Sequence, residues 1–380
     1  MGRTDGRTRR KRRRAKPKNK TLRRIKKLAR KNARHIRVKD HTPRAARIYS
    51  ALHSFSPQVN RILRSQRSIP PDPDVLRCRN QFDVSILTRG KRRCVGWNTR
   101  AAQRAMLNNL RAKKPPRCKR IIAPKQYLAN CWFNAFFMVF FVSDKGRKFF
   151  RYMREAMITG VLPGGNEVGP KLRKPFFLLN KYVEASLRGK DDSTRLAEVM
   201  DTNAIIRSIY HALQGGEGNR LGVPKTRTAW NPLDYYETIA GYLTGSRPLV
   251  WRSYLDATVG NIRGKEHGRD AADILFLELT ERKANKIHKP RSFHIGKGSS
   301  RREYKLDSVV LRDNRKQHFT AYLTCAGKPY AFDGMSFSRL TPFPWPGMLN
   351  APKTWEFVSG RAMRFSFQRG YQILVYYRHR

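Results

Sequence analysis

Acidic residues, cysteines and long apolar runs are all scarce in this sequence. Its 380 residues include 27 Asp and Glu against 81 Lys and Arg, so the formal net charge is +54. The longest apolar stretch, residues 131–142, has 12 residues, whereas a membrane-spanning helix needs about 20. We therefore expect no transmembrane segment, and the polar, basic start of the chain predicts no signal peptide.

The cysteines number five, and no two of them form a CxxC pair. They are Cys78, Cys94, Cys118, Cys131 and Cys325. An odd number without paired spacing predicts neither a disulfide framework nor a ribbon-type zinc site. The sequence therefore favours a reducing compartment, and we expect no metal.

Positive charge is concentrated in the first third of the chain. Residues 1–120 hold 39 Lys and Arg against 5 Asp and no Glu, whereas residues 121–380 hold 42 Lys and Arg against 22 acidic residues. The first 39 residues alone contain 20 Lys and Arg, and repulsion at that density prevents compaction without a polyanion. We predict a disordered basic arm at 1–39, a basic extension of uncertain fold at 40–120, and a folded domain at 121–380.

The arm predicts a polyanionic partner. Its densest basic run is Arg9, Arg10, Lys11, Arg12, Arg13 and Arg14. So large a positive excess favours contacts with phosphates that release counterions, and no sequence-reading motif is visible, so we expect nonspecific binding of nucleic acid. A nuclear-import or solubilising tail and an anionic membrane surface remain alternatives.

Helical patterns precede strand patterns along the folded domain. Residues 131–159, 172–214 and 232–243 have the periodicity of helices. From residue 273 onward short strands alternate with turn signals, at 274–279, 304–311, 318–323, 329–332 and 371–377. Helices followed by strands predict the α+β class, and the strands predict an antiparallel sheet.

Cys131 stands at the start of the strongest helical segment, which makes it a candidate nucleophile. A thiol in the first turn of a helix feels the positive end of the helix dipole, which favours the nucleophilic thiolate. Asn130 is the predicted cap of this helix, and Gln126 is placed to direct its amide N–H at a developing oxyanion. Taken alone, the pattern is weak, because a single cysteine before an apolar helix is usually a buried core thiol.

His318 is the histidine best placed to serve as a base. Strands at 318–324 and 329–333 flank residues 325–328, so a hairpin turning there pairs residues whose numbers sum to about 651. That register sets His318 opposite Asp333, where the carboxylate can hold the imidazole N–H. The alternative is an exposed histidine at a strand end with an unrelated aspartate in a turn.

Several separated motifs, in order along the chain, resemble the ubiquitin-specific protease family. Residues 126–135 are similar to its Cys box, N-x-G-x-x-C-Y-x-N-S, and residues 231–237 are similar to its D-x-x-E-F/L helix. Residues 304–322 resemble its His box, and residues 371–378 resemble its closing strand. The resemblance covers about residues 121–378 and implies a papain-like cysteine peptidase, in which a helical subdomain carries the nucleophile and an antiparallel sheet carries His and Asp.

The resemblance assigns roles to the residues of the triad. Cys131, His318 and Asp333 match the three catalytic positions, and Gln126 matches the oxyanion position. The implied partners are ubiquitin or ubiquitin-like conjugates, and no cofactor is expected.

Three further residues bear on substrate binding. Asp234 and Glu237 match the acids that receive the arginines of the ubiquitin tail, although a solvated helix face would carry the same residues. Gln317 replaces the family's small residue before the catalytic His, and its larger side chain predicts a narrower channel for a Gly-Gly tail. The paired cysteines of the family's zinc-bearing fingers are missing.

Residues 136–150 resemble divergent family members that large DNA viruses of algae and protists encode. This resemblance implies a protein that is packaged in a virion and reaches the cytoplasm or nucleus of a host cell, with capsid proteins as further partners, and that is not secreted. Two functions stay open. One is a thiol peptidase that cleaves after a ubiquitin-like tail, and the other is a catalytically weak or inactive minor capsid protein that bridges capsid and genome.

Overall fold

The computed structural model of the protein describes the main part of the chain. The described residues are 70–112, 116–162, 165–188, 200–213, 231–244, 251–265, 272–296, 298, 301–313, 317–357 and 363–379. The basic run at residues 9–14 lies outside them. No helix in the described residues combines the length and apolarity needed to cross a membrane.

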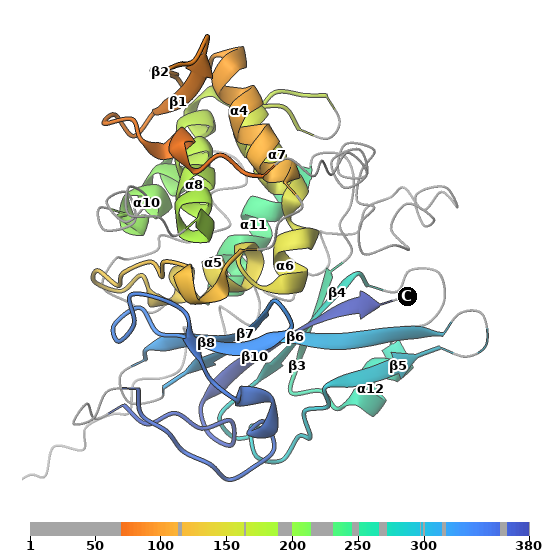
Figure 1. Ribbon diagram of the computed structural model, residues 1–380. Coiled ribbons are helices and arrows are strands. Elements are labelled where there is room, and N and C mark those ends of the chain that lie inside the picture. Colours follow the sequence, from red (N-terminus) through yellow and green to blue (C-terminus); the bar gives the residue numbers. More distant parts are fainter. Residues whose placement is uncertain are drawn as a thin grey trace, which may run out of the picture. The chain divides into compact units, whose positions relative to one another are not determined.

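Helices and one large mixed sheet make up the described chain, so the predicted α+β class is confirmed (Figure 1). The helices are α4 Arg100–Arg111, α5 Cys131–Phe141, α6 Asp144–Phe149, α7 Arg151–Thr159, α8 Pro170–Arg188, α10 Thr202–Leu213, α11 Pro232–Thr244 and α12 Val259–Lys265. Short 3-10 helices are η1 Pro73–Leu76, η2 Cys118–Arg120 and η6 Trp345–Gly347. The strands are β1 Asp83–Thr88, β2 Lys91–Gly96, β3 Trp251–Leu255, β4 Ile274–Leu279, β5 Ser292–Ile295, β6 Arg302–Arg312, β7 Phe319–Cys325, β8 Lys328–Phe332, β9 Thr341–Pro342 and β10 Tyr371–His379.

The strand order of the large sheet is β3-β4-β10-β6-β7-β8-β9, and β5 pairs with β6 outside that path. Its neighbours are antiparallel except β3 and β4, which run parallel. The predicted strands, β4, β6, β7, β8 and β10, pair with one another antiparallel as expected, and the sheet is mixed because it also contains β3. Helix α12 lies between β3 and β4 in the chain and belongs to the crossover that parallel neighbours need. Sequence periodicity does not predict β3, because it is only five residues long and carries Arg252 and Ser253.

The two faces of the sheet bury two different cores. On β4, Ile274 and Phe276 belong to the core shared with the helices, whereas Leu275 and Leu277 belong to the core on the opposite face. This period of two is the pattern of a strand buried on both sides. Helix α5 contributes to the first core with all of its side chains buried, and Figure 1 shows α4 to α11 gathered on one side of the sheet.

The segment predicted as helical over 131–159 is divided into α5, α6 and α7. The Ser143 hydroxyl starts α6 by accepting a hydrogen bond from the backbone N–H of Gly146 at 3.1 Å. A Cβ atom at Gly146 would lie 2.1 Å from the carbonyl oxygen of Val139, so only glycine permits this close turn. Apolar periodicity continues through the breaks, which is why it does not detect them.

Residues 73–111 form a small unit packed on α7 and α8. Its core joins Val75, Val84 and Met106 to Ile158 of α7 and Phe177 of α8. The unit therefore shares a core with the helical layer, an arrangement that the sequence of residues 40–120 did not predict.

Buried charges fasten this unit to α8. Glu184 is fully buried and accepts hydrogen bonds from Arg154 at 2.7 Å and from Asn109 at 3.0 Å. Lys181 Nζ donates to the carbonyl oxygens of Gln81 at 2.8 Å and Asp83 at 2.7 Å. A rotation of the unit on the helices would leave buried charges without partners, which is strongly destabilising. These contacts therefore fix the orientation of the unit.

Two disulfides contradict the prediction that the cysteines form no framework. Cys78 bonds Cys94 across 16 residues, Cys118 bonds Cys325 across 207 residues, and Cys131 is free. Sequence spacing could not reveal the pairs, because one joins β2 to the segment before β1 and the other joins segments that are far apart in the sequence. The argument for a reducing compartment rested on absent disulfides and therefore falls.

The two disulfides should stabilise the fold unequally. A cross-link removes more entropy from the unfolded chain when its loop is longer, which gives about 5 kcal/mol for Cys118–Cys325 and about 3 kcal/mol for Cys78–Cys94. We expect urea unfolding to be shifted further by Cys118→Ser with Cys325→Ser than by Cys78→Ser with Cys94→Ser. Equal losses of unfolding free energy would contradict this order.

Candidate active site

Cys131 is the first residue of α5, and its thiol is free and nearly buried, with 5% of its surface exposed. Asn130 does not cap the helix through its side chain, contrary to prediction. Its Oδ1 accepts from the backbone N–H of Tyr127 at 3.1 Å, and its Nδ2 donates to the Thr202 hydroxyl at 2.8 Å. That hydroxyl donates to Asn134 Oδ1 at 2.8 Å, so a buried polar chain fixes the start of α5.

The hairpin that carries His318 turns within the predicted residues 325–328, but the predicted sum of paired numbers was too low by two. Cys325 pairs with Lys328, and the two turn residues, Ala326 and Gly327, have φ values of 50° and 73°. Two positive φ angles are typical of the tight turn that follows the right-handed strand twist. Paired numbers therefore sum to 653, which sets Thr320 opposite Asp333, with His318 two residues along on the same side of β7.

His318 and Asp333 are nevertheless in direct contact. His318 Nε2 donates to Asp333 Oδ1 at 2.6 Å, and both side chains are buried. Asp333 also accepts from the backbone N–H of Met335 at 3.0 Å and from the Ser336 hydroxyl at 2.6 Å. The diagonal neighbour on a strand pair is within reach of a long side chain, so the contact survives the change of register.

The electrostatics of the pair favour a charged imidazole. Burial acts to lower the pKa of His318, but the hydrogen bonds and charges of Asp333 and Cys131 outweigh it and raise that pKa to about 9. Burial acts to raise the pKa of Asp333, but the contacts with His318 and Ser336 keep it below its usual value. At neutral pH the pair is therefore an imidazolium held by a carboxylate.

Cys131 also acts on this ring. Burial lowers the pKa of His318, and the contacts with Cys131 add to those with Asp333 in raising it. Because Nε2 is taken by Asp333, the other ring nitrogen, Nδ1, is left to exchange a proton with sulfur; it is buried and makes no other hydrogen bond. A thiol, an imidazole and an orienting carboxylate in this order are what nucleophilic acyl transfer requires.

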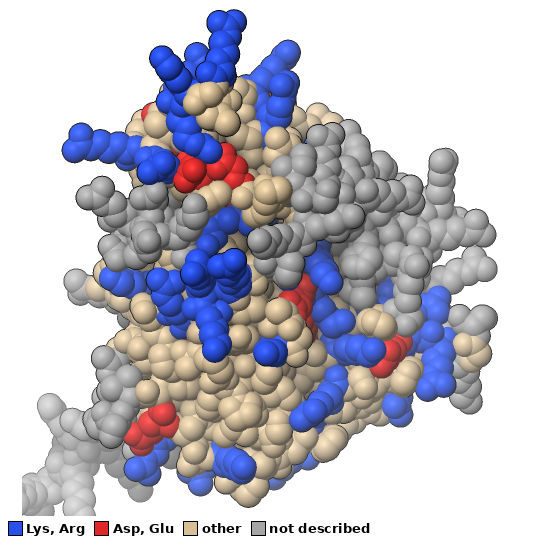
Figure 2. Space-filling view, viewed as in Figure 1, with Lys and Arg blue, Asp and Glu red and all other residues tan. Residues whose placement is uncertain are grey.

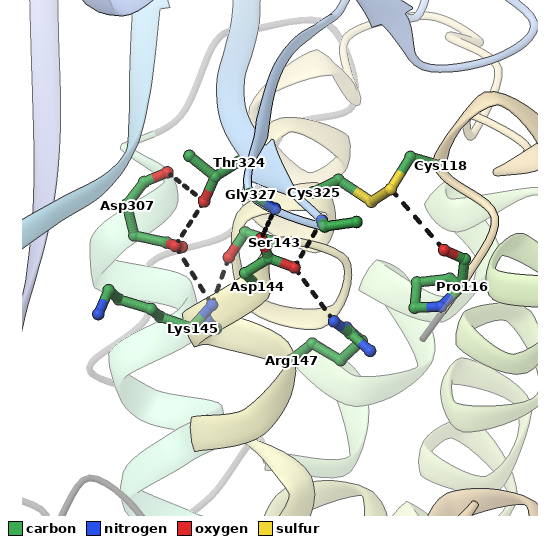
Figure 3. Close-up of polar contacts among 12 residues, drawn as sticks. Pro116, Cys118, Ser143, Asp144, Lys145, Arg147, Asp307, Thr324, Cys325 and Gly327 are labelled. Carbon is green, nitrogen blue, oxygen red and sulfur yellow. Dashed lines mark hydrogen bonds and ion pairs between the residues drawn. A yellow bond between two sulfur atoms is a disulfide. The ribbon is translucent and has the colours of Figure 1, made fainter. Parts of the chain in front are cut away.

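Contacts at the far end of the hairpin hold this arrangement (Figure 3). The carboxylate of Asp144, at the start of α6, accepts from the backbone N–H groups of Ala326 at 2.9 Å and Gly327 at 2.8 Å. Figure 3 shows the disulfide of Cys325 beside this contact. The turn of the hairpin is thus tied to the helix that follows α5, so Cys131 and His318 are positioned by adjoining elements.

Buried Asp307 ties a second point of the hairpin. Its carboxylate accepts from the Thr324 hydroxyl at 2.8 Å and from the backbone N–H of Lys145 at 3.2 Å (Figure 3). Burial raises the pKa of Asp307 even though these hydrogen bonds oppose the shift. A buried carboxyl between α6 and β7 reinforces the same orientation.

Gln126 lies next to the triad, in the loop before Cys131. Its backbone N–H donates to the carbonyl oxygen of Gly334, which follows Asp333, at 3.0 Å. Its side-chain Nε2 donates to the carbonyl oxygen of Leu128 at 3.1 Å. One of the two amide hydrogens is therefore engaged within the loop, and the second is available to a ligand.

The two predicted tail-binding acids belong to a larger group. Asp234 and Glu237 are half-buried on α11, and the carboxylate of Glu278 on β4 is close enough to affect both. Burial first, and then the neighbouring carboxylates, raise the pKa of Asp234 to about 7 and that of Glu237 to about 8. We call Asp234, Glu237 and Glu278 the acidic trio; it is not the open pair of carboxylates on a solvated face that the sequence alone allowed.

The sequence did not identify Glu278 as part of the site. Glu278 accepts from the Tyr371 hydroxyl at 2.6 Å and from the Ser253 hydroxyl. The available signal was a single acid inside the apolar run of β4, Ile274–Leu279, where a charged side chain needs partners.

Gln317 is exposed and directly precedes His318. Its φ of 52° lies in the left-handed region, which a glycine adopts at less cost. The backbone at this position therefore keeps the geometry of a glycine while carrying a larger side chain. Within the described residues, no group of three or more His, Cys, Asp or Glu side chains could hold a metal ion.

Replacing Asp333 should test the charge of the base. In Asp333→Asn the carboxylate that raises the pKa of His318 is removed, so this pKa should fall from about 9, and modification of Cys131 should slow roughly a hundredfold or more. Ring-proton shifts measured against pH report the pKa. Ser336→Ala is the matched control, since it removes one hydrogen bond from Asp333 and leaves its charge.

The stability of the protein should follow the same pair. A raised pKa of His318 means that its contribution is complete below its unfolded value of about 6.5 and is lost as the pH rises through about 9. Asp333→Asn should remove this loss of unfolding free energy on the alkaline side. An unchanged pKa of His318 in Asp333→Asn would show that the contact does not govern its charge.

Neutralising one member of the acidic trio should change the other two. The pKa values of Asp234 and Glu237 are raised to about 7 and about 8. The free energy of unfolding therefore falls as the pH rises from the pKa values of the unfolded chain toward these raised values. Glu278→Gln removes one repelling charge, so both pKa values should fall and stability should decline less between pH 4 and pH 8. Glu356→Gln, at an exposed ion pair with Arg364, serves as control and should leave that decline unchanged.

Comparisons with known proteins give a distant likeness in backbone only. No protein-family model matches the chain, and no curated protein matches it. Similar solved structures include a chain of the SAGA Ubp8/Sgf11/Sus1/Sgf73 DUB module bound to ubiquitin aldehyde, with 11% identity, coverage of 76% of this chain and 77% of that chain, and a TM-score of 0.45. A chain of the module bound to monoubiquitin has 9% identity, coverage of 70% and 71%, and a TM-score of 0.44. The function is therefore argued from the site itself.

Proposed function

We propose that this protein is a papain-like thiol hydrolase of the ubiquitin-specific protease type, which cleaves a peptide or isopeptide bond after a ubiquitin-like tail. The observation that carries the proposal is the free Cys131 thiol at the start of α5, beside a buried His318 that Asp333 holds at 2.6 Å. A core thiol needs no such partners, whereas a nucleophile needs both.

The reaction uses each member of this group in turn. With His318 already protonated, the reactive form pairs its imidazolium with the thiolate of Cys131, and this thiolate attacks the carbonyl carbon of the scissile bond. The negative charge that develops on the carbonyl oxygen is stabilised by backbone N–H groups and by the remaining amide hydrogen of Gln126. The C–N bond then breaks, the imidazolium protonates the departing amine, and a water molecule, deprotonated by His318, hydrolyses the thioester.

The acidic trio supplies the substrate preference in this proposal. A tail with basic residues would bring positive charge to the acidic trio, where burial and repulsion between the carboxylates raise the pKa values of Asp234 and Glu237 in the free protein. Binding such a tail relieves that repulsion and releases protons near neutral pH. The trio therefore favours a basic extended segment over an acidic one.

Gln317 should limit access of a Gly-Gly tail to Cys131. Its exposed side chain stands beside His318 where two glycines of a tail would pass, so Gln317→Gly should raise the rate at which an electrophilic ubiquitin warhead modifies Cys131. Glycine also suits the positive φ at this position, so the gain should come without loss of stability. Cys131→Ala is the blank for the labelling reaction.

The outcome separates two cases. A natural protein that already reacts as fast as Gln317→Gly would show that the channel has adapted to the larger side chain. Silence from both forms would favour the second candidate function, a catalytically weak protein that bridges a capsid and a genome in a virion.

Binding to a polyanion is that second candidate, and one feature of the described residues supports it. Figure 2 shows Lys and Arg side chains projecting from the part of the molecule formed by β1, β2 and α4. Exposed cations in this unit include Arg89, Lys91, Arg93, Arg100 and Arg104. The nearby carboxylates of Asp72 and Asp74 are already engaged by Arg92 at 2.9 Å and 3.5 Å, so the exposed cations remain available to phosphates.

Salt dependence tests this binding. The affinity of the full chain for a nonspecific DNA duplex should fall steeply with salt, and deletion of residues 1–39 should flatten that slope. Neutralising Arg89, Lys91 and Arg93 with Gln should flatten it further, by roughly one unit of slope for each phosphate that the variant no longer neutralises. The charge-matched control is Gln at the exposed residues Lys283, Lys286 and Lys353, which lie outside the arm and this unit. An unchanged slope after both changes would refute nucleic-acid binding by these cations.

A further inference from the structure

Among the described residues few large apolar side chains are exposed, and half of these exposed side chains stand beside the candidate active site. Among the described residues they are Leu87, Tyr127, Leu128, Val161, Leu255 and Met335. Tyr127 and Leu128 belong to the loop that leads into Cys131, and Met335 is two residues after Asp333. Isolated exposed apolar residues need no explanation, but a concentration at one place does.

The two segments that carry these side chains are joined. The backbone N–H of Gln126 donates to the carbonyl oxygen of Gly334 at 3.0 Å. A Cβ atom on Gly334 would lie 3.1 Å from the carbonyl oxygen of Pro124 and 3.3 Å from Gln126 Cβ, so glycine permits this approach. Tyr127 and Met335 are the next residues on the two segments, and we call Tyr127, Leu128 and Met335 the apolar rim.

In the loop of the apolar rim, both backbone groups of Tyr127, its N–H and its carbonyl oxygen, are hydrogen-bonded. The backbone N–H of Tyr127 donates to Asn130 Oδ1 at 3.1 Å, and its carbonyl oxygen accepts from Asn203 Nδ2 at 2.8 Å. Gln126 Nε2 donates to the carbonyl oxygen of Leu128 at 3.1 Å. On the other segment, the backbone N–H of Met335 donates to Asp333. The rim is therefore rigid and coupled to the same residues that position the nucleophile and the base.

Leu128 is unfavourable for folding in two respects. Its φ of 56° lies in the left-handed region, which costs a leucine about 1–2 kcal/mol relative to its preferred conformations. Its side chain is 68% exposed, so burial returns little of that cost. Glycine or asparagine would adopt this backbone more readily, and strain of this kind that persists at a reactive site indicates a functional use.

We infer that the apolar rim binds an apolar side chain of the substrate close to the scissile bond, with Leu128 as its principal contact. The inference rests on the proposed function and names the substrate class that this same site prefers. A chain that reaches Cys131 passes the loop before it, and covering Leu128 there removes apolar surface from water on both partners. Carboxylates that would select a basic side chain are placed on α11 and β4 instead.

Peptidyl chloromethyl ketones can test this preference on the full chain. Pairs of tripeptide reagents would carry leucine or asparagine, which have nearly equal size, at one position at a time. At one position the natural protein should alkylate Cys131 about tenfold faster with the leucine reagent, as burial of about 50–60 Å² of apolar surface predicts. Leu128→Asn should reduce this ratio to below about threefold, because asparagine tolerates the left-handed backbone and removes only the apolar contact.

Two controls separate the possible failures. Leu87→Asn changes a leucine that is 62% exposed on β1, outside the loop, and should leave the ratio unchanged. Alkylation by iodoacetamide, which has no side chain to select, reports whether Cys131 is activated by His318. A rate that His318→Ala does not lower would refute the proposed function. A His318-dependent rate without preference for leucine at any position, or a preference that Leu128→Asn leaves intact, would refute the apolar rim alone.

Discussion

The contact between His318 and Asp333 is the interaction on which the arrangement of the site depends. Both side chains are buried at the open end of a hairpin whose turn is held by Asp144 and by the Cys118–Cys325 disulfide. Removing the carboxylate would leave an imidazole buried with no charge to hold it, and removing the hairpin's anchors would free the pair to move from Cys131. The contacts that hold this hairpin therefore also hold the proposed catalytic groups.

Much of the sheet and of the site could be predicted from the sequence, since both depend on local patterns. The strand at Ile274–Leu279 has the predicted bounds, and the other predicted strands differ from the observed ones by a few residues at their ends. The contact between His318 and Asp333 was predicted from a hairpin with four intervening residues. The predicted sum of paired numbers was wrong by two, but residues two apart lie on the same face of a strand, so the two side chains remain within reach.

Other features depend on contacts between distant segments, and no local pattern reveals them. Cys118 and Cys325 meet only after α5 and the sheet have packed, and Glu278 joins Asp234 and Glu237 only because β4 runs beside α11. The predicted cap failed for a local reason. Asn130 has the right residue type, but its Oδ1, the atom that would cap the helix, accepts from the backbone N–H of Tyr127 instead.

Two backbone conformations link the stability of this protein to its proposed activity. Leu128 and Gln317 both have positive φ. Leu128 lies three residues before Cys131, and Gln317 lies directly before His318. A glycine at either position would relieve strain, yet both carry large exposed side chains. Side chains that face solvent add nothing to core packing, so packing does not explain the strain at these two positions. Strain that persists beside Cys131 and His318 is expected of a site selected for what it binds.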